Sequence, residues 1–319
     1  MKGLYFDEKP QYRADLPKPA RKADESLIRV NIAAICNTDK EVIKGYKSGF
    51  KGIMGHEFTG VVVESDNSDL LGKRVVCEIN DNCEECLYCN TGRPHHCIKR
   101  RVPGLSHMDG CFAGFIAVPD KLLHVIPDDL PDEKAVFTEP LAAAVEVLEQ
   151  NHLRPSQEVA IIGDGRLSFL IAQVLSLNGS GVTVFGKHEE KLSMFAPFAK
   201  TVLINENIDK ISINGVPDTF ETVIEASGSP SGMQTAFKLV RSCGLLILKS
   251  TYAGKIDIDL SEVVVRELTI KGSRCGPFEP ALNLLKKGLI TCPAITLFPV
   301  EEFKKAFEDT GFKAGFDFR

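Results

Sequence analysis

Residues 159–175 read VAIIGDGRLSFLIAQVL, an apolar run that meets two closely spaced glycines and continues with the apolar spacing of a helix. This pattern suits a dinucleotide. Gly163 permits a tight turn, Gly165 lets the backbone approach a pyrophosphate, and the helix N-terminus offers N–H groups to the phosphates. Ser168 replaces the third glycine of the usual pattern, which is expected to loosen the packing of helix on strand. Taken alone, the stretch is equally explained by a strand, turn and helix without a ligand.

The segments around this stretch strengthen the nucleotide interpretation. From EVAIIG at 158–163 to ELTIKG at 267–272, short apolar strands alternate with helical segments. Such alternation predicts a parallel sheet with helices on both faces. The next strand ends at Phe185, about twenty residues after the glycines. The residue that reads the cofactor ribose is expected at this position.

The end of that second strand indicates which cofactor is bound. NAD sites usually carry Asp or Glu there, but this chain has Gly186, Lys187 and His188. No carboxylate at the strand end repels a 2′-phosphate, and two side chains could attract one, so the sequence modestly favours NADP over NAD. Two alternatives stay open: Lys187 is a solvated loop lysine, or Glu189 and Glu190 approach the ribose.

The N-terminal part of the chain has a different pattern. Between about Ser26 and Val125, short β-type runs are separated by Gly, Asn, Asp and Lys clusters, which predicts a mainly β domain. The 319 residues suffice for two domains. The net charge of −5 argues against a nucleic-acid partner. Without a long apolar run or a signal-like start, a cytoplasmic protein with no membrane partner is expected.

Residues 83–97 read CEECLYCNTGRPHHC and contain the densest set of metal-binding side chains. Four thiolates at this spacing suit one tetrahedral zinc and leave no open position, so the expected role is structural. An iron–sulfur cluster or plain buried thiols are the alternatives. Because four thiolates complete the site, His95 and His96 are interpreted as loop surface. The expected structural ligands are Cys83, Cys86, Cys89 and Cys97.

Other candidate ligands are scattered and undistinctive one by one. Cys36 ends an apolar run in AAICNTDK, His56 and Glu57 lie in IMGHEFTG, and Glu139 lies in FTEPLAAA. A core thiol, a hydrogen-bonded histidine and a carboxylate at a helix N-terminus would each explain them.

Taken in order, the motifs resemble the zinc-dependent medium-chain dehydrogenase family, which includes alcohol, sorbitol and threonine dehydrogenases. The resemblance rests on CNTD, GHEFTGVV, the cysteine lobe, DGCFAGFIAV, TEPLAAA, the glycine turn, EASGSPSGM and KGSRCGPF. It implies an α/β protein with a GroES-like β-barrel catalytic domain and a Rossmann dinucleotide-binding domain with a doubly wound parallel sheet. The implied boundaries are 1–148 for the catalytic domain, with a structural zinc lobe at 80–100, 149–272 for the Rossmann domain, and 273–319 for the return to the catalytic domain.

The resemblance also implies a catalytic zinc on Cys36, His56 and Glu139, with Glu57 beside it as an exchangeable ligand. A carboxylate as third ligand is more similar to the sorbitol and polyol branch than to the liver alcohol dehydrogenases. One thiolate, one neutral imidazole and one carboxylate neutralise Zn²⁺ and leave an open position for a substrate oxygen.

Further roles follow from the same resemblance. Thr38 matches the hydroxyl that relays the substrate proton, and Asp39 matches the carboxylate that orients the zinc-bound histidine. Glu41 stands where some members have a relay histidine, so the outer proton path stays open. The expected catalytic residues are Thr38, Asp39 and Glu57. The expected cofactor-binding residues are Gly163, Gly165, Arg166, Leu167, Gly186, Lys187, His188 and Ser227.

The implied function is hydride transfer between an alcohol or polyol, or the corresponding carbonyl compound, and NAD(P), with zinc as a Lewis acid. An aldehyde or sugar reductase of the same family and a catalytically idle nucleotide-binding protein are the alternatives. The substrate is a small molecule of open identity, and Phe50 and Phe112 either line its pocket or only pack. A homodimer or homotetramer is expected, in which ELTIKG pairs across a two-fold axis.

Overall fold

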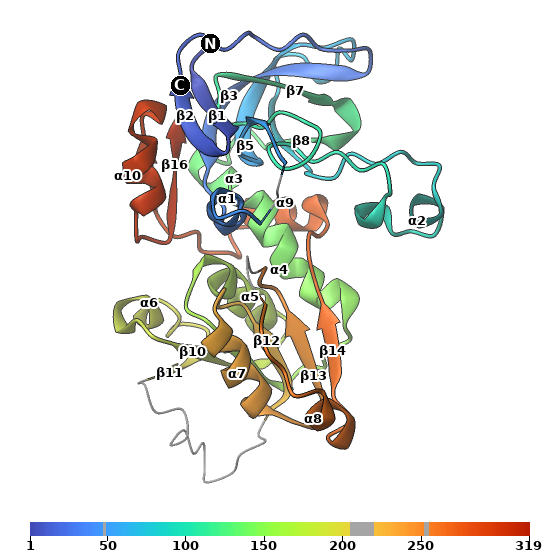
Figure 1. Ribbon diagram of the computed structural model, residues 1–319, viewed down its shortest axis with the longest axis vertical. Helices are drawn as coiled ribbons and strands as arrows, with labels where there is room; N and C mark the ends of the chain where they lie inside the picture. Colours follow the sequence, from blue (N-terminus) through green and yellow to red (C-terminus); the bar gives the residue numbers. More distant parts are fainter. Residues whose placement is uncertain (47–48, 205–219, 252–254) are drawn as a thin grey trace. The chain divides into compact units, whose positions relative to one another are not determined.

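The computed structural model describes residues 1–46, 49–204, 220–251 and 255–319. The chain forms two compact units (Figure 1): the first is Met1–Glu139 with Phe278–Arg319, and the second is Pro140–Pro277. The first unit is therefore built from both ends of the chain. The unit boundary lies in helix α4 (Thr138–Gln150), whose first two residues belong to the first unit and the rest to the second. Within the described ranges, no helix is long and apolar enough to cross a membrane.

A seven-stranded sheet dominates the first unit, in the order β15-β16-β3-β5-β6-β8 with β7 also paired to β3. Strand β3, with the sequence ESLIRVNIAA, is buried at every position except Arg29, as expected of a central strand. A smaller sheet has the order β2-β1-β4. The strand bounds are β1 Gly3–Asp7, β2 Lys9–Arg13, β3 Glu25–Ala34, β4 Gly52–Ile53, β5 Glu57–Glu64, β6 Arg74–Cys77, β7 Phe115–Pro119, β8 Leu123–Val125, β15 Ile295–Phe298 and β16 Lys313–Asp317.

The helices of the first unit are short. The segment that carries α2 projects from the body of the unit (Figure 1), and it contains the four clustered cysteines. Besides the start of α4, the helices are α1 Asn37–Ile43, α2 Leu87–Asn90, α3 Asp132–Ala135, α9 Phe278–Lys286 and α10 Phe303–Glu308, with 3₁₀ turns η1 Pro94–His96, η2 Asp120–Leu122 and η4 Val300–Glu302.

Aromatic packing in this unit fixes the loop that carries His56. The rings of Phe112 and Phe316 meet edge to face at 5.0 Å, and both residues are fully buried. Gly55 lies against Phe112 with φ +92°, and a Cβ at Gly55 would lie 2.2 Å from that ring. Both the positive φ and the contact with the Phe112 ring therefore require glycine at the position before His56. Phe50 stacks on Phe6 at 6.3 Å, so Phe50 and Phe112 both serve packing.

The second unit contains a six-stranded sheet in the order β11-β10-β9-β12-β13-β14, and all its described pairs are parallel. The sequence prediction of a doubly wound parallel sheet is confirmed. The order reverses between β9 and β12, and nucleotides bind beyond the carboxyl ends of strands at such a point. The bounds are β9 Glu158–Ile162, β10 Gly181–Gly186, β11 Lys200–Leu203, β12 Phe220–Glu225, β13 Val240–Leu248, β14 Thr269–Gly272, α5 Arg166–Leu177, α6 Glu189–Ser193, α7 Pro230–Leu239 and α8 Leu260–Val265.

Candidate metal centres and cofactor site

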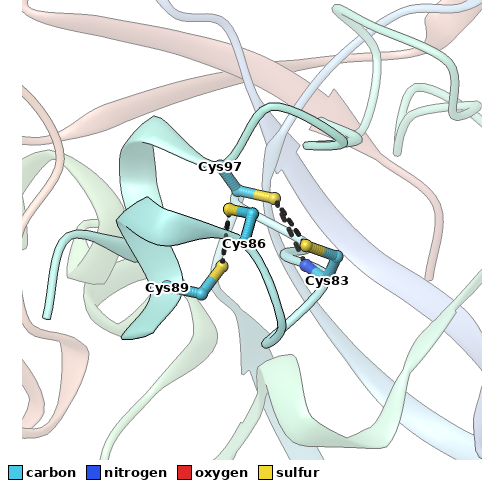
Figure 2. A group of neighbouring side chains, drawn as sticks. All are labelled: Cys83, Cys86, Cys89 and Cys97. Atoms are coloured by element: carbon cyan, nitrogen blue, oxygen red, sulfur yellow. Dashed lines mark hydrogen bonds between the residues drawn. The ribbon is translucent and has the colours of Figure 1, made fainter. Parts of the chain in front are cut away.

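Four sulfur atoms lie together in the projecting lobe (Figure 2), all within 4.8 Å of one another: those of Cys83, Cys86, Cys89 and Cys97. The sulfurs of Cys83 and Cys97 are 3.4 Å apart, and those of Cys86 and Cys89 are 3.5 Å apart. A disulfide would set two sulfurs about 2.05 Å apart, whereas zinc bonds of about 2.3 Å in a tetrahedron set them about 3.8 Å apart. The donor set therefore fits one zinc ion with closed coordination.

The lobe shifts the pKa values of neighbouring cysteines in opposite directions. Backbone hydrogen bonds from Cys89 and Ile98 lower the pKa of Cys86 to about 6. Desolvation and the hydrogen bond with Cys86 raise the pKa of Cys89 to about 11. The metal-free pair thus retains a proton that a bound metal displaces. Neither neighbouring histidine belongs to the group, and His96 instead packs on Tyr88 at 6.1 Å.

A second group of donors comprises Cys36, His56 and Glu57, whose ligand atoms also lie within 4.8 Å of one another. The sheet brings them together. Strands β3 and β5 are antiparallel with Ala34 directly opposite Glu57, so the residues that follow β3 meet the residues that begin β5. His56 and Glu57 are neighbours in the chain, and the register of β3 against β5 brings Cys36 to them.

Asp39 lies behind this group and contacts two of its members. Its carboxylate accepts a hydrogen bond from the Cys36 backbone N–H at 2.8 Å and lies 3.2 Å from His56 Nδ1. With Nδ1 turned toward Asp39, Nε2 is the nitrogen left to bind a metal. Burial opposes the charged form of His56, but Asp39 and Cys36 outweigh it and hold its pKa well above the ordinary value in the metal-free chain.

Glu57 is paired with a residue that the sequence analysis did not single out. Its Oε2 accepts a hydrogen bond from the ammonium of Lys313, and both side chains are fully buried. Lys313 begins β16, which pairs with β3. The sequence signal of this contact was a lysine in the largely apolar run FKAGFDF, which also contains Asp317.

The glycine turn of the second unit is shaped for close backbone approach. Gly163 has φ +117°, and a Cβ there would lie 2.8 Å from Ala226 O and from Ser227 Cα. Gly165 caps α5, and no atom lies within 4 Å of the place where its Cβ would be. This open side fits a pyrophosphate at the helix N-terminus. Arg166 and Leu167 begin the helix there.

Asp164 links this turn to the end of β10. Its Oδ2 accepts hydrogen bonds from the backbone N–H groups of Lys187 and His188, each at 2.7 Å. The His188 ring nitrogen Nδ1 lies 3.0 Å from the same oxygen, and the Lys187 ammonium donates to Ser231 Oγ at 3.0 Å. Both basic side chains at the strand end therefore have protein partners.

Two family models match this chain. That of the alcohol dehydrogenase GroES-like domain matches residues 22–128, and that of the zinc-binding dehydrogenase matches residues 167–287. The chain belongs to the zinc-dependent medium-chain dehydrogenase family. This dehydrogenase is an enzyme that uses zinc and NAD(P).

Named relatives cover nearly the whole dehydrogenase. The D-arabitol-phosphate dehydrogenase of Enterococcus avium is 29% identical over 314 residues, covering 92% of this chain and 89% of the relative. D-arabinitol dehydrogenase 1 of Uromyces fabae is 28% identical over 334 residues, covering 97% and 93%. A short chain alcohol dehydrogenase of Escherichia coli CFT073, solved with NADH, is 25% identical with a TM-score of 0.88 and 99% of each chain covered.

Two of the three residues expected to bind the catalytic zinc of the dehydrogenase lie together, and the third is not in their group among the described residues. Cys36 and His56 lie together, but the carboxylate within 4.8 Å of them is that of Glu57, and Glu139 is not part of this group in the described residues. Glu139 lies in the first turn of α4, whereas Glu57 follows His56 directly in the chain. Adjacency in the chain thus places the Glu57 carboxylate beside His56.

The remaining expected residues of the dehydrogenase lie close to their groups. Thr38 is half-buried in α1, two positions after Cys36. Glu41, at the position where some family members have a relay histidine, forms an ion pair with the Lys44 ammonium at 2.8 Å. Ser227 lies beside Gly163 and donates from its N–H and its hydroxyl to Glu225, at 2.8 and 2.6 Å. Ser168 is fully buried in α5.

Proposed function

We propose that this enzyme transfers a hydride between a small polyol and NAD(P). The observation that carries the proposal is the group of Cys36, His56 and Glu57, half-buried at Cys36 and buried at the other two, which offers one thiolate, one imidazole and one carboxylate. Such a set of sulfur, nitrogen and oxygen donors suits a zinc ion and leaves a position for a substrate oxygen. The polyol and polyol-phosphate dehydrogenases among the relatives support a polyhydroxylated substrate.

Each residue of the group has a separate task in this proposal. Zinc, when bound, supplies a Lewis acid for the substrate hydroxyl, and the nicotinamide accepts the hydride. Asp39 holds the Nδ1 side of His56 and the backbone of Cys36, so both donors are positioned before any substrate arrives. Thr38, half-buried beside Cys36, is the hydroxyl that moves the substrate proton outward.

The third zinc ligand in this proposal is the carboxylate of either Glu57 or Glu139. We assign the resident position to Glu57, because its carboxylate lies within 4.8 Å of the Cys36 and His56 donors. Glu139, expected from the resemblance as the third ligand, is the candidate to exchange with it. Lys313 holds Oε2 of Glu57 and fixes the orientation of this carboxylate.

The assembly and location proposed here are those of a cytoplasmic homodimer. Strand β14 lies at the edge of its sheet and pairs with β13 alone among the described strands. Next to it in the chain, α8 exposes Leu260, Val264 and Val265 by 70%, 75% and 77%. An edge strand flanked by exposed apolar side chains suits pairing with a second copy across a two-fold axis. Thiolate ligands are maintained in a reducing compartment.

The experiment is a matrix of substrates and cofactors with the zinc-loaded enzyme. Alcohols, polyols, polyol phosphates and the matching carbonyl compounds are assayed in both directions with NAD(H) and NADP(H). Turnover of at least one polyol, lost on zinc removal and regained on its return, supports the proposal. Turnover of simple aldehydes alone would favour the reductase alternative, and no turnover with two bound zinc ions would favour the idle nucleotide-binding protein.

A further inference from the structure

The position that reads the cofactor ribose is unusual in this chain. In a Rossmann domain a carboxylate near the end of the second strand accepts hydrogen bonds from the adenosine ribose. Here β10 ends at Gly186, which has no side chain, and a lysine follows. A Cβ at Gly186 would lie 2.6 Å from both Cβ and Oδ2 of Asp164. The side chain of Asp164 therefore occupies the space beside the strand end.

Backbone hydrogen bonds hold the Asp164 carboxylate in this place. The N–H groups of Lys187 and His188 both donate to Oδ2 at 2.7 Å, and the His188 ring lies 3.1 Å from Oδ1. The side chain is 11% exposed, so it is packed but still reaches the surface of the turn. Asp164 also stands directly before Gly165, the residue at which the backbone is expected to approach the pyrophosphate.

We propose that Asp164 supplies the ribose-reading carboxylate and makes this enzyme select NAD over NADP. The inference rests on the proposed dinucleotide-dependent function and adds its specificity determinant. The carboxylate of Asp164 lies on the turn after β9. Glycine is required at position 186, the end of β10, because a larger residue there would collide with the Asp164 side chain.

The charges around the strand end support this selection. A carboxylate accepts hydrogen bonds from ribose hydroxyls, whereas a 2′-phosphate would bring a charge of about −2 next to it. The two cationic candidates face other groups: the Lys187 ammonium donates to Ser231 Oγ, and the His188 ring contacts Asp164 itself. The strand-end amides that could bind a 2′-phosphate already donate to Asp164. The sequence-based preference for NADP did not include this carboxylate.

The test measures binding of cofactor fragments, so that catalysis is not needed for the readout. Isothermal titration of the zinc-loaded enzyme gives the dissociation constants of ADP-ribose and of 2′-phospho-ADP-ribose. The variant is Asp164→Asn, whose side-chain oxygen can still accept from the two backbone N–H groups. Asp164→Ala is the second variant, and Glu262→Gln on exposed α8 is a matched change of charge in the same unit.

The expected result is that the native enzyme binds ADP-ribose more tightly than its 2′-phosphorylated form. Asp164→Asn shifts the ratio of the two dissociation constants by at least about tenfold toward the phosphorylated fragment, or about 1.4 kcal/mol. Asp164→Ala shifts it in the same direction, while Glu262→Gln leaves it unchanged. Lys187→Ala also leaves the ratio unchanged, because that lysine is not the selecting group.

Other results overturn the inference. If the native enzyme binds both fragments but Asp164→Asn leaves the ratio unchanged while the thermal midpoint and zinc content stay native, Asp164 does not select the cofactor. If Lys187→Ala weakens only the phosphorylated fragment tenfold and the native enzyme prefers that fragment, the enzyme selects NADP through Lys187. If the native enzyme binds neither fragment, the dinucleotide function fails together with the inference.

Discussion

Lys313 and Glu57, 256 positions apart in the sequence, form an ion pair that is fully buried inside the first unit. The Lys313 ammonium also lies 5.9 Å from the centre of the Phe137 ring. A buried charge is tolerated only with a partner, so each member of the pair makes the other necessary. Strand β16 thus contacts the Glu57 carboxylate through the side chain of Lys313.

Replacement of Lys313 by Met is expected to destabilise the enzyme strongly. The change leaves the Glu57 carboxylate buried without its cation, a loss of about 3–5 kcal/mol in the free energy of unfolding. Urea unfolding of the metal-free protein measures it, and Glu57→Gln in the same chain should recover part of the loss. Lys304→Met, on the exposed side of α10, is the control. Equal unfolding midpoints for Lys313→Met and Lys304→Met would contradict a stabilising pair.

Cys89→Ser should affect the fold before the hydride step. Loss of one of four thiolates weakens a closed zinc site whose binding energy contributes to folding. We expect one zinc fewer per chain by elemental analysis and a thermal midpoint lower by about 5 °C or more. The turnover number of the molecules that remain folded should stay close to native. Cys243→Ser, at an exposed thiol outside both donor groups, is the matched control; a loss of turnover with a native midpoint would argue against a structural role.

Cys36→Ser should give the opposite pattern. The structural lobe keeps its zinc and the thermal midpoint falls little, but the second zinc is lost. The rate of hydride transfer should fall by at least about 1000-fold, because a Lewis acid contributes several kcal/mol to such a step. Zinc content and single-turnover absorbance of the reduced nicotinamide measure the two effects. Native activity in a one-zinc protein would exclude a catalytic metal at Cys36.

Glu57→Gln and Glu139→Gln together identify the third ligand. If Glu57 holds the resident position, its amide variant should weaken zinc binding by more than the roughly 10- to 100-fold that loss of a hydrogen-bond partner of a ligand costs, with a smaller effect at Glu139. Competition with a chromogenic chelator gives the affinities. The reverse order would return Glu139 to the position that the sequence resemblance gave it. In that case Glu57 is the exchangeable ligand.

Val264→Glu should separate the proposed dimer. The side chain is 75% exposed on α8, so the substitution is compatible with the folded chain, whereas a carboxylate at an apolar interface between copies is costly. Sedimentation velocity at several concentrations should show a dimer for the native enzyme and a monomer for the variant, with unchanged zinc content. Leu177→Glu, at another exposed apolar position of the second unit, should leave the dimer intact.

The sequence alone determined the features that depend on short-range pattern. The turn around Gly163 and Gly165, the alternation of strands and helices, and the spacing of Cys83, Cys86, Cys89 and Cys97 are all local. Each is set by few neighbouring residues, because backbone freedom, helix periodicity and tetrahedral coordination act over a few positions. The parallel sheet and the clustering of these four sulfurs are both present in the structure.

Only the tertiary structure decided which distant side chains share a site. Register between β3 and β5 brings Cys36 to His56 and Glu57, and strand β16 brings Lys313 to Glu57. Similarly, Gly186 has no side chain and leaves space for Asp164 at the end of β10. No local pattern encodes these contacts, since they depend on sheet register and on the space that neighbouring side chains leave. The cysteine lobe could therefore be found from its sequence, whereas the pairing of Glu57 with Lys313 and the position of Asp164 at the strand end required the fold.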